Sequence, residues 1–300
     1  MRVLLIAGGW SKERQVSLNG AAQIKEALKS LGHEVLFLDL SPDYQELVNK
    51  AREADAAIIN LHGAPGEDGS IQGVLEDVGL PYQGSGVRGS FLALNKALSK
   101  QFYANHGLRT PRGGLYYPRG RLHHVPPPVI CKPNQGGSSL DMQIFYNQEE
   151  MYSFLNQVDS EHEILVEELI NGHEVSCAVL DNEPLPPILI QPVKGDFFDY
   201  NSKYDPDGAV EICPAPISQE ASRSIQEMSL QAHRILGLRH YSRSDFMLDQ
   251  QDNIYILETN TLPGMTRTSL VPKAAQQAGI GFTELIARLL SLALNSNQPR

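Results

Sequence analysis

Three oxygen-bearing side chains occupy one predicted hairpin near the end of the chain. The segment SRSDFMLDQQDNIYILETN, from Ser242 to Asn260, has the pattern of two strands joined by a polar turn around residues 251–253. Alternate residues of a strand share a face, so Glu258 and Asn260 point the same way, and Asp245 lies opposite one or the other depending on register. Hard oxygen donors on a strand pair suit Mg2+, which completes its coordination with water and nucleotide phosphates.

Arg243 extends this candidate site. It is in phase with Asp245, and a guanidinium beside a metal can stabilise a phosphoryl group during transfer. The same alternation also fits the solvated face of an antiparallel hairpin, which needs no ligand. The hairpin therefore indicates phosphoryl-transfer chemistry, with Asp245, Glu258 and Asn260 as candidate metal ligands, and a plain surface hairpin remains the alternative.

A second group of candidate residues follows the predicted N-terminal strands. Apolar strands at 3–7, 35–39 and 56–61 alternate with helical patterns such as 21–31, whose apolar residues recur every three to four positions. This alternation is typical of an open parallel α/β sheet, in which ligands bind beyond the carboxyl ends of the strands. Gly8, Gly9 and the segment 61–70 fall at those ends.

Two further domains are predicted beyond this sheet. From about residue 95 the pattern changes to a helix ending near residue 106, a Pro-rich link and strands at 129–132 and 164–168. From about residue 175 come strands at 175–180 and 188–191, a helix at about 219–236, the hairpin and a closing helix at about 282–294. We therefore expect domains at residues 1–94, 95–174 and 175–300.

Composition narrows the class of protein. A chain of 300 residues that is 41% hydrophobic can bury two or three cores. Its net charge of -10 carries no basic block, so a nucleic-acid partner is not expected. The apolar run at 3–7 is too short for a signal or membrane segment, so no membrane association is expected. Three cysteines without C-x-x-C spacing argue against disulfides and zinc and favour the reducing cytoplasm.

Four further motifs combine with the hairpin into a family resemblance. They are SKERQVSL (11–18), LHGAPGEDGSIQG (61–73), LPYQGSG (80–86) and TLPGMTRTSLVP (261–272). In this order, and over nearly the whole chain, they resemble the D-alanine–D-alanine ligases of the ATP-grasp superfamily. The resemblance implies an α/β chain, α+β overall, with the ATP-grasp fold: the N-terminal open parallel sheet precedes two ATP-grasp domains that hold ATP between them.

The resemblance also implies an activity, cofactors and partners. The expected reaction is ATP-dependent ligation of two D-alanine molecules into D-alanyl-D-alanine for peptidoglycan synthesis, through a D-alanyl phosphate. ATP and two Mg2+ ions, or Mn2+ in their place, would be required, and the protein would be a cytoplasmic homodimer.

The resemblance assigns the substrate-binding and catalytic residues. Glu13 would hold the ammonium of the first D-alanine, because a buried cation needs an anionic partner; a helix-start acid is the plainer interpretation. His62 would contact substrate, although it follows a buried strand and could be structural. Arg243 and the N–H of Gly264 would form the oxyanion site. Ser269 and Leu270 would line the second-substrate pocket.

The nucleotide-binding residues come from the same resemblance. Lys96 and Lys132 would bind ATP phosphates, although lysines are usually solvated surface charges. The Gly-rich segment 134–139, with Ser138 and Ser139, could approach phosphates through its backbone. The adenine and ribose would be recognised along the strand VEELI and just after it. The remaining residues expected at the nucleotide are Glu167, Glu168, Ile170 and Glu174.

A polar loop at 199–208 resembles the family's lid. In it Lys203 would reach ATP, and Tyr204 would hydrogen-bond toward Ser138 and Glu13. A closed lid would exclude water from the acyl phosphate. Tyrosine at this position accompanies dipeptide rather than depsipeptide formation in related ligases, so an amine is the expected second nucleophile.

Three residues depart from the family's usual pattern, and they leave substrate identity open. Gly136 and Asp141 lie in the predicted phosphate loop, and Arg267 flanks the second-substrate pocket. An ATP-grasp ligase joining other small amino or hydroxy acids is therefore the alternative. A regulatory nucleotide-binding module is a rival from another class, but the candidate catalytic residues are all present. A dinucleotide-dependent oxidoreductase fits poorly, because residues 7–11 lack G-x-G-x-x-G.

Overall fold

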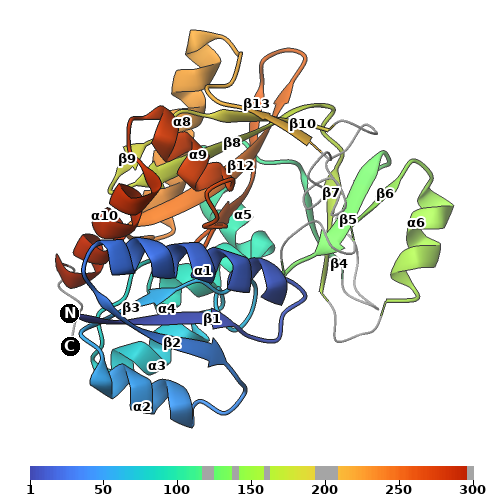
Figure 1. Cartoon of the computed structure of the whole chain (residues 1–300). Coiled ribbons are helices and arrows are strands. Elements are labelled where there is room, and N and C mark those ends of the chain that lie inside the picture. Colours follow the sequence, from blue (N-terminus) through green and yellow to red (C-terminus); the bar gives the residue numbers. More distant parts are fainter. Residues whose placement is uncertain (117–124, 137–141, 159–162, 193–208, 296–300) are drawn as a thin grey trace.

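The structure is a computed structural model that describes residues 1–116, 125–136, 142–158, 163–192 and 209–295. Its described strands form three sheets, each with its own covering helices (Figure 1). The N-terminal sheet lies at the bottom of the view, the central sheet stands apart at the right, and the C-terminal sheet lies above. This arrangement confirms the three-domain mixed α/β fold.

The N-terminal sheet is parallel, with strand order β2-β1-β3. The strands are β1 (Arg2–Gly8), β2 (Glu34–Leu40) and β3 (Ala56–Ile59), and the helices of this domain are α1 (Arg14–Ser30), α2 (Gln45–Glu53), α3 (Ser70–Val78) and α4 (Val87–Leu94). The side chains from Val3 to Ala7 are fully buried. A continuous apolar run is what a strand covered on both faces requires, which is why the sequence alone located it.

The central sheet is antiparallel and small. Its order is β4-β7-β5-β6, formed by β4 (Gly113–Tyr116), β5 (Val129–Pro133), β6 (Gln143–Phe145) and β7 (Ile164–Glu168). Helix α5 (Lys96–Asn105) leads into it, and α6 (Gln148–Leu155) packs against one face with Met151 and Leu155 buried. Gly113 has φ +157, and a Cβ there would lie 2.1 Å from the carbonyl oxygen of Val166, so only glycine allows β4 this close to β7.

The C-terminal sheet carries the predicted hairpin. Its main order is β11-β10-β8-β12-β13, with β9 paired to β8. The strands are β8 (Gly172–Leu180), β9 (Glu183–Pro184), β10 (Ile188–Pro192), β11 (Ala209–Ile212), β12 (Tyr241–Asp249) and β13 (Ile254–Asn260). Helix α8 (Gln219–Ile235) is capped by Ser218, whose side chain accepts from the Ala221 N–H, and it packs on β8, β12 and β13.

The two last helices return to the N-terminal sheet. Helix α10 (Phe282–Asn295) lies beside α1 in Figure 1 and contacts both α1 and β3, whereas α9 (Leu270–Gln277) contacts α10 and β8. Their buried side chains join the core of the N-terminal sheet, together with residues of β8 and β12. The domain bounds 1–94, 95–174 and 175–300 stay a prediction. Within the described residues no single helix has the length and apolar composition to cross a membrane, and α9 and α10 meet that test only as a pair bent by 103°.

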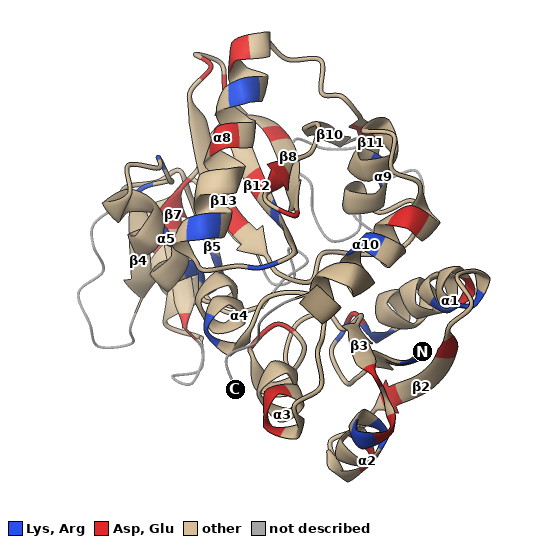
Figure 2. Cartoon of the chain, turned by 90° about the vertical axis from the view of Figure 1, so that its left-hand side faces the viewer, with Lys and Arg blue, Asp and Glu red and all other residues tan. Residues whose placement is uncertain are grey.

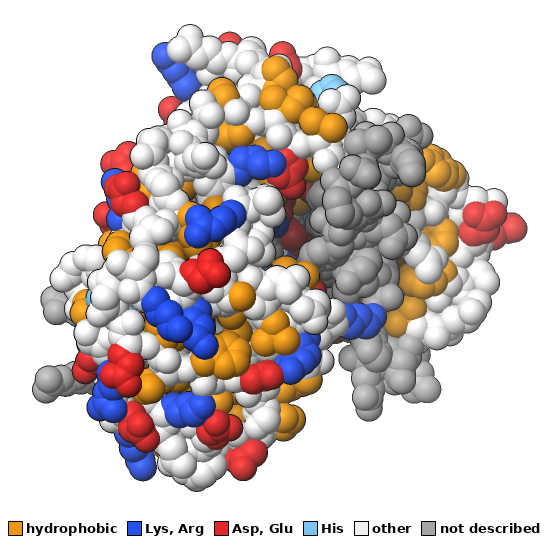
Figure 3. All heavy atoms as spheres, viewed as in Figure 1, with side chains coloured by type: hydrophobic (Ala, Val, Ile, Leu, Met, Phe, Trp, Pro, Cys, Tyr) orange, Lys and Arg blue, Asp and Glu red, His pale blue; other side chains and the backbone are white. Residues whose placement is uncertain are grey.

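On the described residues that Figures 2 and 3 draw, charges of both signs are interspersed. Figure 2 shows Lys or Arg and Asp or Glu side by side on α1 and α2, and the face drawn in Figure 3 also carries both signs close together. Many surface charges therefore have an opposite neighbour, such as Lys50 and Glu46 at 3.0 Å on α2. Such exposed pairs contribute little stability.

Candidate active site

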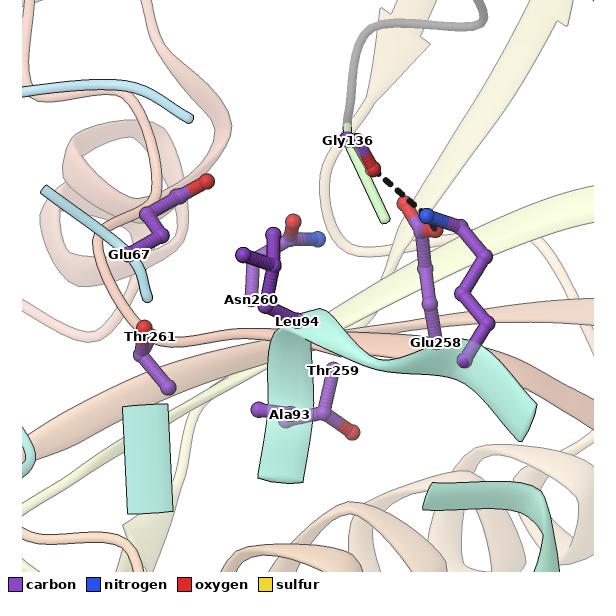
Figure 4. A pocket seen from close by; sticks show the side chains of 9 residues that line it. Glu67, Ala93, Leu94, Gly136, Glu258, Thr259, Asn260 and Thr261 are labelled. Carbon is purple, nitrogen blue, oxygen red and sulfur yellow. Dashed lines mark hydrogen bonds and ion pairs between the residues drawn. The ribbon is translucent and has the colours of Figure 1, made fainter. Parts of the chain in front are cut away.

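A pocket lies where residues of all three sheets meet. The end of β13 forms its floor, the junction of α4 and α5 one wall, and the loop after β3 another. Figure 4 shows Glu67 and Glu258 on opposite sides of this pocket with Asn260 between them. The lining residues are Glu67, Ala93, Leu94, Lys96, Gly136, Glu258, Thr259, Asn260 and Thr261.

The hairpin register brings the predicted oxygen ligands together. Asp245 pairs with Glu258 and Arg243 with Asn260, which decides the register that the sequence left open. Asp245 is 4% exposed and accepts four hydrogen bonds. Arg243 donates from Nε to Oδ1 at 2.9 Å and from an Nη to Oδ2 at 2.6 Å. Ser176 Oγ donates to Oδ1 at 2.7 Å, and Asn260 Nδ2 donates to Oδ2 at 3.2 Å. The carboxylate is therefore fixed in place from both neighbouring strands.

Lys96 joins the hairpin to the loop after β5. Its Nζ lies 3.4 Å from Glu258 Oε2 and donates to the Gly136 carbonyl at 2.5 Å. The start of α5 is positioned by Asn95, whose side chain accepts from the Leu98 N–H, and by Asn134, which accepts from the N–H groups of Lys96 and Ala97. An N-terminal cap is what a helix start needs to satisfy its free N–H groups. The predicted phosphate lysine is thus held at a defined point of the pocket.

These donors fit a divalent cation in part. Two carboxylates and an amide oxygen share one face, as hard cations require. Among the described residues no three His, Cys, Asp or Glu side chains form a metal cluster, so Asn260, water or phosphate oxygens would have to complete the coordination. The Asp245 carboxylate is also engaged by Arg243, with which a cation would compete.

Glu167 lies between two buried lysines. Its carboxylate, 1% exposed, contacts Lys132 Nζ at 2.5 Å through Oε2 and Lys100 Nζ through Oε1. Burial alone would raise the pKa of Glu167, but Lys132 and Lys100 outweigh it and the pKa falls. Burial opposes the charge of Lys132 too, but Glu167 outweighs it and the lysine pKa rises. Burial dominates at Lys100 and lowers its pKa despite the contact with Glu167.

The other predicted nucleotide residues lie nearby on β7 and β8. Glu168 faces the opposite side of β7 from Glu167, and Arg112 donates to it from its backbone N–H and its Nε, both at 2.8 Å. Ile170 is half-buried in the turn before β8. Glu174 is half-buried on β8, opposite Met247 of β12, and its charge acts on Lys132 and Arg243.

The first-substrate residues approach the pocket from the N-terminal sheet. Glu13 immediately precedes α1, and its N–H donates to Ser11 Oγ at 3.2 Å. His62 is 8% exposed, and its Nε2 is buried without a hydrogen-bond partner among the described residues. Burial lowers the pKa of His62, whereas the charge of Glu13 raises it. An unsatisfied buried nitrogen costs free energy, which a bound ligand oxygen would recover.

A tight turn holds the loop that carries Glu13. Gly8 has φ +79, and a Cβ there would meet Asp39 Oδ1 at 2.0 Å and Arg14 Nη1 at 2.7 Å. Those two side chains pair through two hydrogen bonds of 2.6 Å, and Arg14 also donates to the Gly9 carbonyl. A larger residue at position 8 would have to displace this ion pair and adopt a left-handed backbone, so glycine suits the sharp turn from β1 into the Glu13 loop.

The predicted second-substrate residues lie on the loop between β13 and α9. Ser269 precedes α9, and its Oγ accepts from the Thr266 N–H at 3.1 Å. A Cβ at Gly264 would lie 3.0 Å from this same Oγ. Leu270 is the first residue of α9 and is half-buried. Arg267 lies against α1 and α10. Its backbone N–H donates to Gln23 Oε1 on α1 at 2.7 Å, and its guanidinium lies 4.8 Å from the centre of the Phe282 ring.

Five residues discussed in the sequence lie outside the part of the chain that the structure describes. They are Ser138, Ser139, Asp141, Lys203 and Tyr204. The roles expected of them stay predictions.

Sequence reasoning missed two buried charged residues of this region. Glu67 is 9% exposed, accepts from the Gly63 N–H at 3.0 Å and faces the pocket. Burial, with the nearby charge of Glu13, raises the pKa of Glu67 to about 8. Lys100 is 7% exposed and holds Glu167. Its spacing of four from Lys96 on one predicted helix was an available signal, because such residues share a face.

Comparisons with known proteins agree with this architecture. Residues 121–291 match the family model for the D-ala D-ala ligase C-terminus. A D-alanine–D-alanine ligase from Desulfovibrio desulfuricans is 50% identical, with 98% of this chain and 97% of the relative covered. A second, from Maridesulfovibrio salexigens, is 51% identical over 97% of this chain and 98% of its own.

Solved structures of D-alanine ligases also resemble this chain. D-alanine–D-alanine ligase from Bacillus anthracis, solved in complex with ATP, superimposes with a TM-score of 0.86 at 32% identity, covering 98% of this chain and 97% of that one. The VanG D-Ala:D-Ser ligase from Enterococcus faecalis has a TM-score of 0.82 at 25% identity, covering 97% and 99%. The fold is that of an ATP-grasp ligase. The chain belongs to the D-alanine–D-alanine ligase family.

Proposed function

We propose that the protein ligates two D-alanine molecules into D-alanyl-D-alanine, converting ATP to ADP and phosphate, and so supplies the dipeptide for peptidoglycan synthesis. The observation that carries the proposal is the pocket where Lys96, Glu258 and Asn260 meet Glu67 of the N-terminal sheet. Charged side chains of both signs at one junction suit ATP and D-alanine, because these ligands carry phosphate, ammonium and carboxylate charges. The 50% identity to a ligase of that name and the ATP-complexed neighbour support it.

The reaction has two steps in which atoms balance. A carboxylate oxygen of the first D-alanine attacks the γ-phosphorus of ATP, ADP leaves, and D-alanyl phosphate forms. The amine of the second D-alanine then attacks the acyl carbon, phosphate leaves with the former carboxylate oxygen, and one proton is released. Activation is needed because a free carboxylate is a poor electrophile. Lys96 and Lys132 are the residues that we assign to the ATP phosphates.

The chain offers partners for each charge of the substrates. Glu13 would accept the first ammonium, and the buried Nε2 of His62 would bond a carboxylate oxygen. Arg243 and the Gly264 N–H would stabilise the oxyanion that develops during amine attack. Ser269 and Leu270 would border the second D-alanine. Roles for Glu167, Glu168, Ile170 and Glu174 at the nucleotide rest on the resemblance, as do those of Ser138, Ser139, Lys203 and Tyr204.

Asp245, Glu258 and Asn260 are the proposed Mg2+ ligands. Two Mg2+ ions, or Mn2+ in their place, would neutralise negative charge on the nucleotide phosphates when bound. Within the chain itself, Lys96 already holds Glu258 and Arg243 already holds Asp245. These ion pairs orient both carboxylates.

A second candidate function differs in the second substrate. A structural neighbour at 25% identity is named as a D-Ala:D-Ser ligase, which supports a second amino acid other than D-alanine as the alternative. A ligase that joins D-alanine to another small amino or hydroxy acid is therefore the alternative. Homodimer formation and a cytoplasmic location are also proposed, the first from family analogy and the second from the requirement for ATP.

Product identification tests the proposal. Purified protein is incubated with ATP and Mg2+ and with D-alanine, L-alanine, D-alanine plus D-serine, or D-alanine plus D-lactate, and ADP release is followed while products are weighed by mass spectrometry. D-alanine-dependent ADP release with D-alanyl-D-alanine as the product is expected. A mixed product made in preference to the homodipeptide would favour the second candidate, and no ADP release with any pair would refute ligase activity.

A further inference from the structure

Helix α5 presents two buried lysines on one face. Lys96 and Lys100 are one helical turn apart and are 6% and 7% exposed. Lys96 reaches Gly136 and Glu258 at the pocket, whereas Lys100 reaches Glu167 on β7. The family resemblance assigns a role to Lys96 only. Burying an unpaired ammonium costs folding free energy, so the burial of Lys100 requires an explanation of its own.

The Lys100 ammonium is fully committed to protein acceptors. Its Nζ donates to the Pro111 carbonyl at 2.5 Å, to Thr110 Oγ1 at 3.1 Å and to Glu167 Oε1. An ammonium has three N–H donors, so none remains for a ligand. Lys100 therefore cannot contact a nucleotide itself while this arrangement persists.

Lys132 differs from Lys100 in its contacts. Among the described residues its Nζ has one direct acceptor, Glu167 Oε2 at 2.5 Å. The three groups in contact comprise two ammoniums and one carboxylate, and thus carry one positive charge in excess. More distant carboxylates, Glu174 and Glu258, also act on Lys132 through space. Among the described residues, Lys132 is thus the one of these two lysines whose ammonium has N–H donors without a direct acceptor.

We propose that Lys100 is a positioning residue that neutralises Glu167 and thereby leaves the charge of Lys132 for a nucleotide phosphate. This inference rests on the proposed function, because it takes this region as the ATP site. Without Lys100, Glu167 would be compensated by Lys132 alone, and phosphate would compete with a buried carboxylate for one ammonium. Affinity for the charged part of the nucleotide would then fall, while affinity for the nucleoside would not.

Binding of ADP and of adenosine tests the proposal. Calorimetric titration of the full chain with each ligand is compared for wild type, Lys100→Met and Lys100→Gln, with folding checked by circular dichroism. Lys50→Met is the matched control, because Lys50 also donates to a backbone carbonyl, that of Phe37 at 2.7 Å, but lies on α2. We expect Lys100→Met to weaken ADP about tenfold or more, with adenosine and the control unchanged.

A double variant separates charge from packing. Lys100→Met with Glu167→Gln removes both charges, so Lys132 no longer has to compensate a buried carboxylate. Because Glu167 is itself expected at the nucleotide, the quantity compared is the ratio of ADP to adenosine affinity, which should exceed that of Lys100→Met alone. Lys100→Gln keeps donors for Pro111 and Thr110 but not the charge, and it should weaken ADP even if the methionine variant fails to fold. Equal weakening of ADP and adenosine, or unchanged ADP binding by Lys100→Gln, would overturn the inference. Wild type that binds no ADP would instead refute the proposed function.

Discussion

Replacing His240 should reduce the loss of folding stability that the protein undergoes at acidic pH. His240 lies at the seam between the N-terminal and C-terminal domains, is 8% exposed, and its Nδ1 accepts the Gly84 N–H at 2.9 Å. Burial, with the nearby charges of Arg239 and His233, lowers its pKa from 6.5 to about 4. The folded state therefore favours the neutral ring. Its contribution to stability is complete above pH 6.5 and is lost as the pH falls from 6.5 toward 4.

The size of the effect follows from this difference in pKa. At pH 5 the ring is almost fully protonated in the unfolded chain and mostly neutral in the folded one, which costs about 2 kcal/mol relative to pH 7.5. Asparagine is the suitable replacement, because its Oδ1 can accept the Gly84 N–H and it tolerates the φ of +64 at this position. The variant His240→Asn should therefore lose about 2 kcal/mol less than wild type over this pH range.

Urea unfolding followed by circular dichroism at pH 7.5 and pH 5 measures the effect. The comparison is between the two proteins at each pH, so shared losses from other titrating groups cancel. His173→Asn, at an exposed position on β8, is the control and should follow wild type. If the free energy of unfolding of His240→Asn depends on pH as that of wild type does, then protonation of His240 does not destabilise the folded protein and the explanation is wrong.

Three further substitutions test the site and its support. Glu258→Gln should lower D-alanine-dependent phosphate release about 100-fold or more with an unchanged circular dichroism spectrum, because it removes one charge facing metal and phosphates; near-normal turnover would refute the metal assignment. Tyr103→Phe should destabilise the protein by about 1 kcal/mol in urea unfolding, because the buried phenol donates to Thr259 Oγ1 at 2.8 Å; an unchanged midpoint would show that this bond contributes nothing. Ser269→Ala should raise KM for the second D-alanine severalfold in steady-state assays while ATP KM stays constant, and equal changes in both would contradict its placement.

Much of the fold could be predicted because its strands are periodic or continuously apolar. The run at 3–7 and the alternation of the hairpin located β1, β12 and β13 closely. The hairpin also placed Asp245 and Glu258 on one face, since strand geometry fixes that relation once the turn is known. Only the choice between two registers required the structure.

Long-range packing could not be predicted in the same way. The closing helix was predicted from its periodicity, but nothing local indicates that α10 buries its apolar face against α1 and β3 of the first domain. Glu67 and Lys100 resemble ordinary surface charges in the sequence, and only folding makes them buried. Burial is what raises the pKa of Glu67 to about 8, and burial is a property of the tertiary structure.

Oxygen transfer tests the central claim most directly. D-alanine labelled with 18O in both carboxylate oxygens is incubated with ATP, Mg2+ and the protein, and the released phosphate is weighed by mass spectrometry. Ligation through D-alanyl phosphate predicts one 18O atom in each phosphate released and one in the peptide carbonyl of the product. Unlabelled phosphate would show that water, and not the D-alanine carboxylate, attacks ATP, and it would contradict the account.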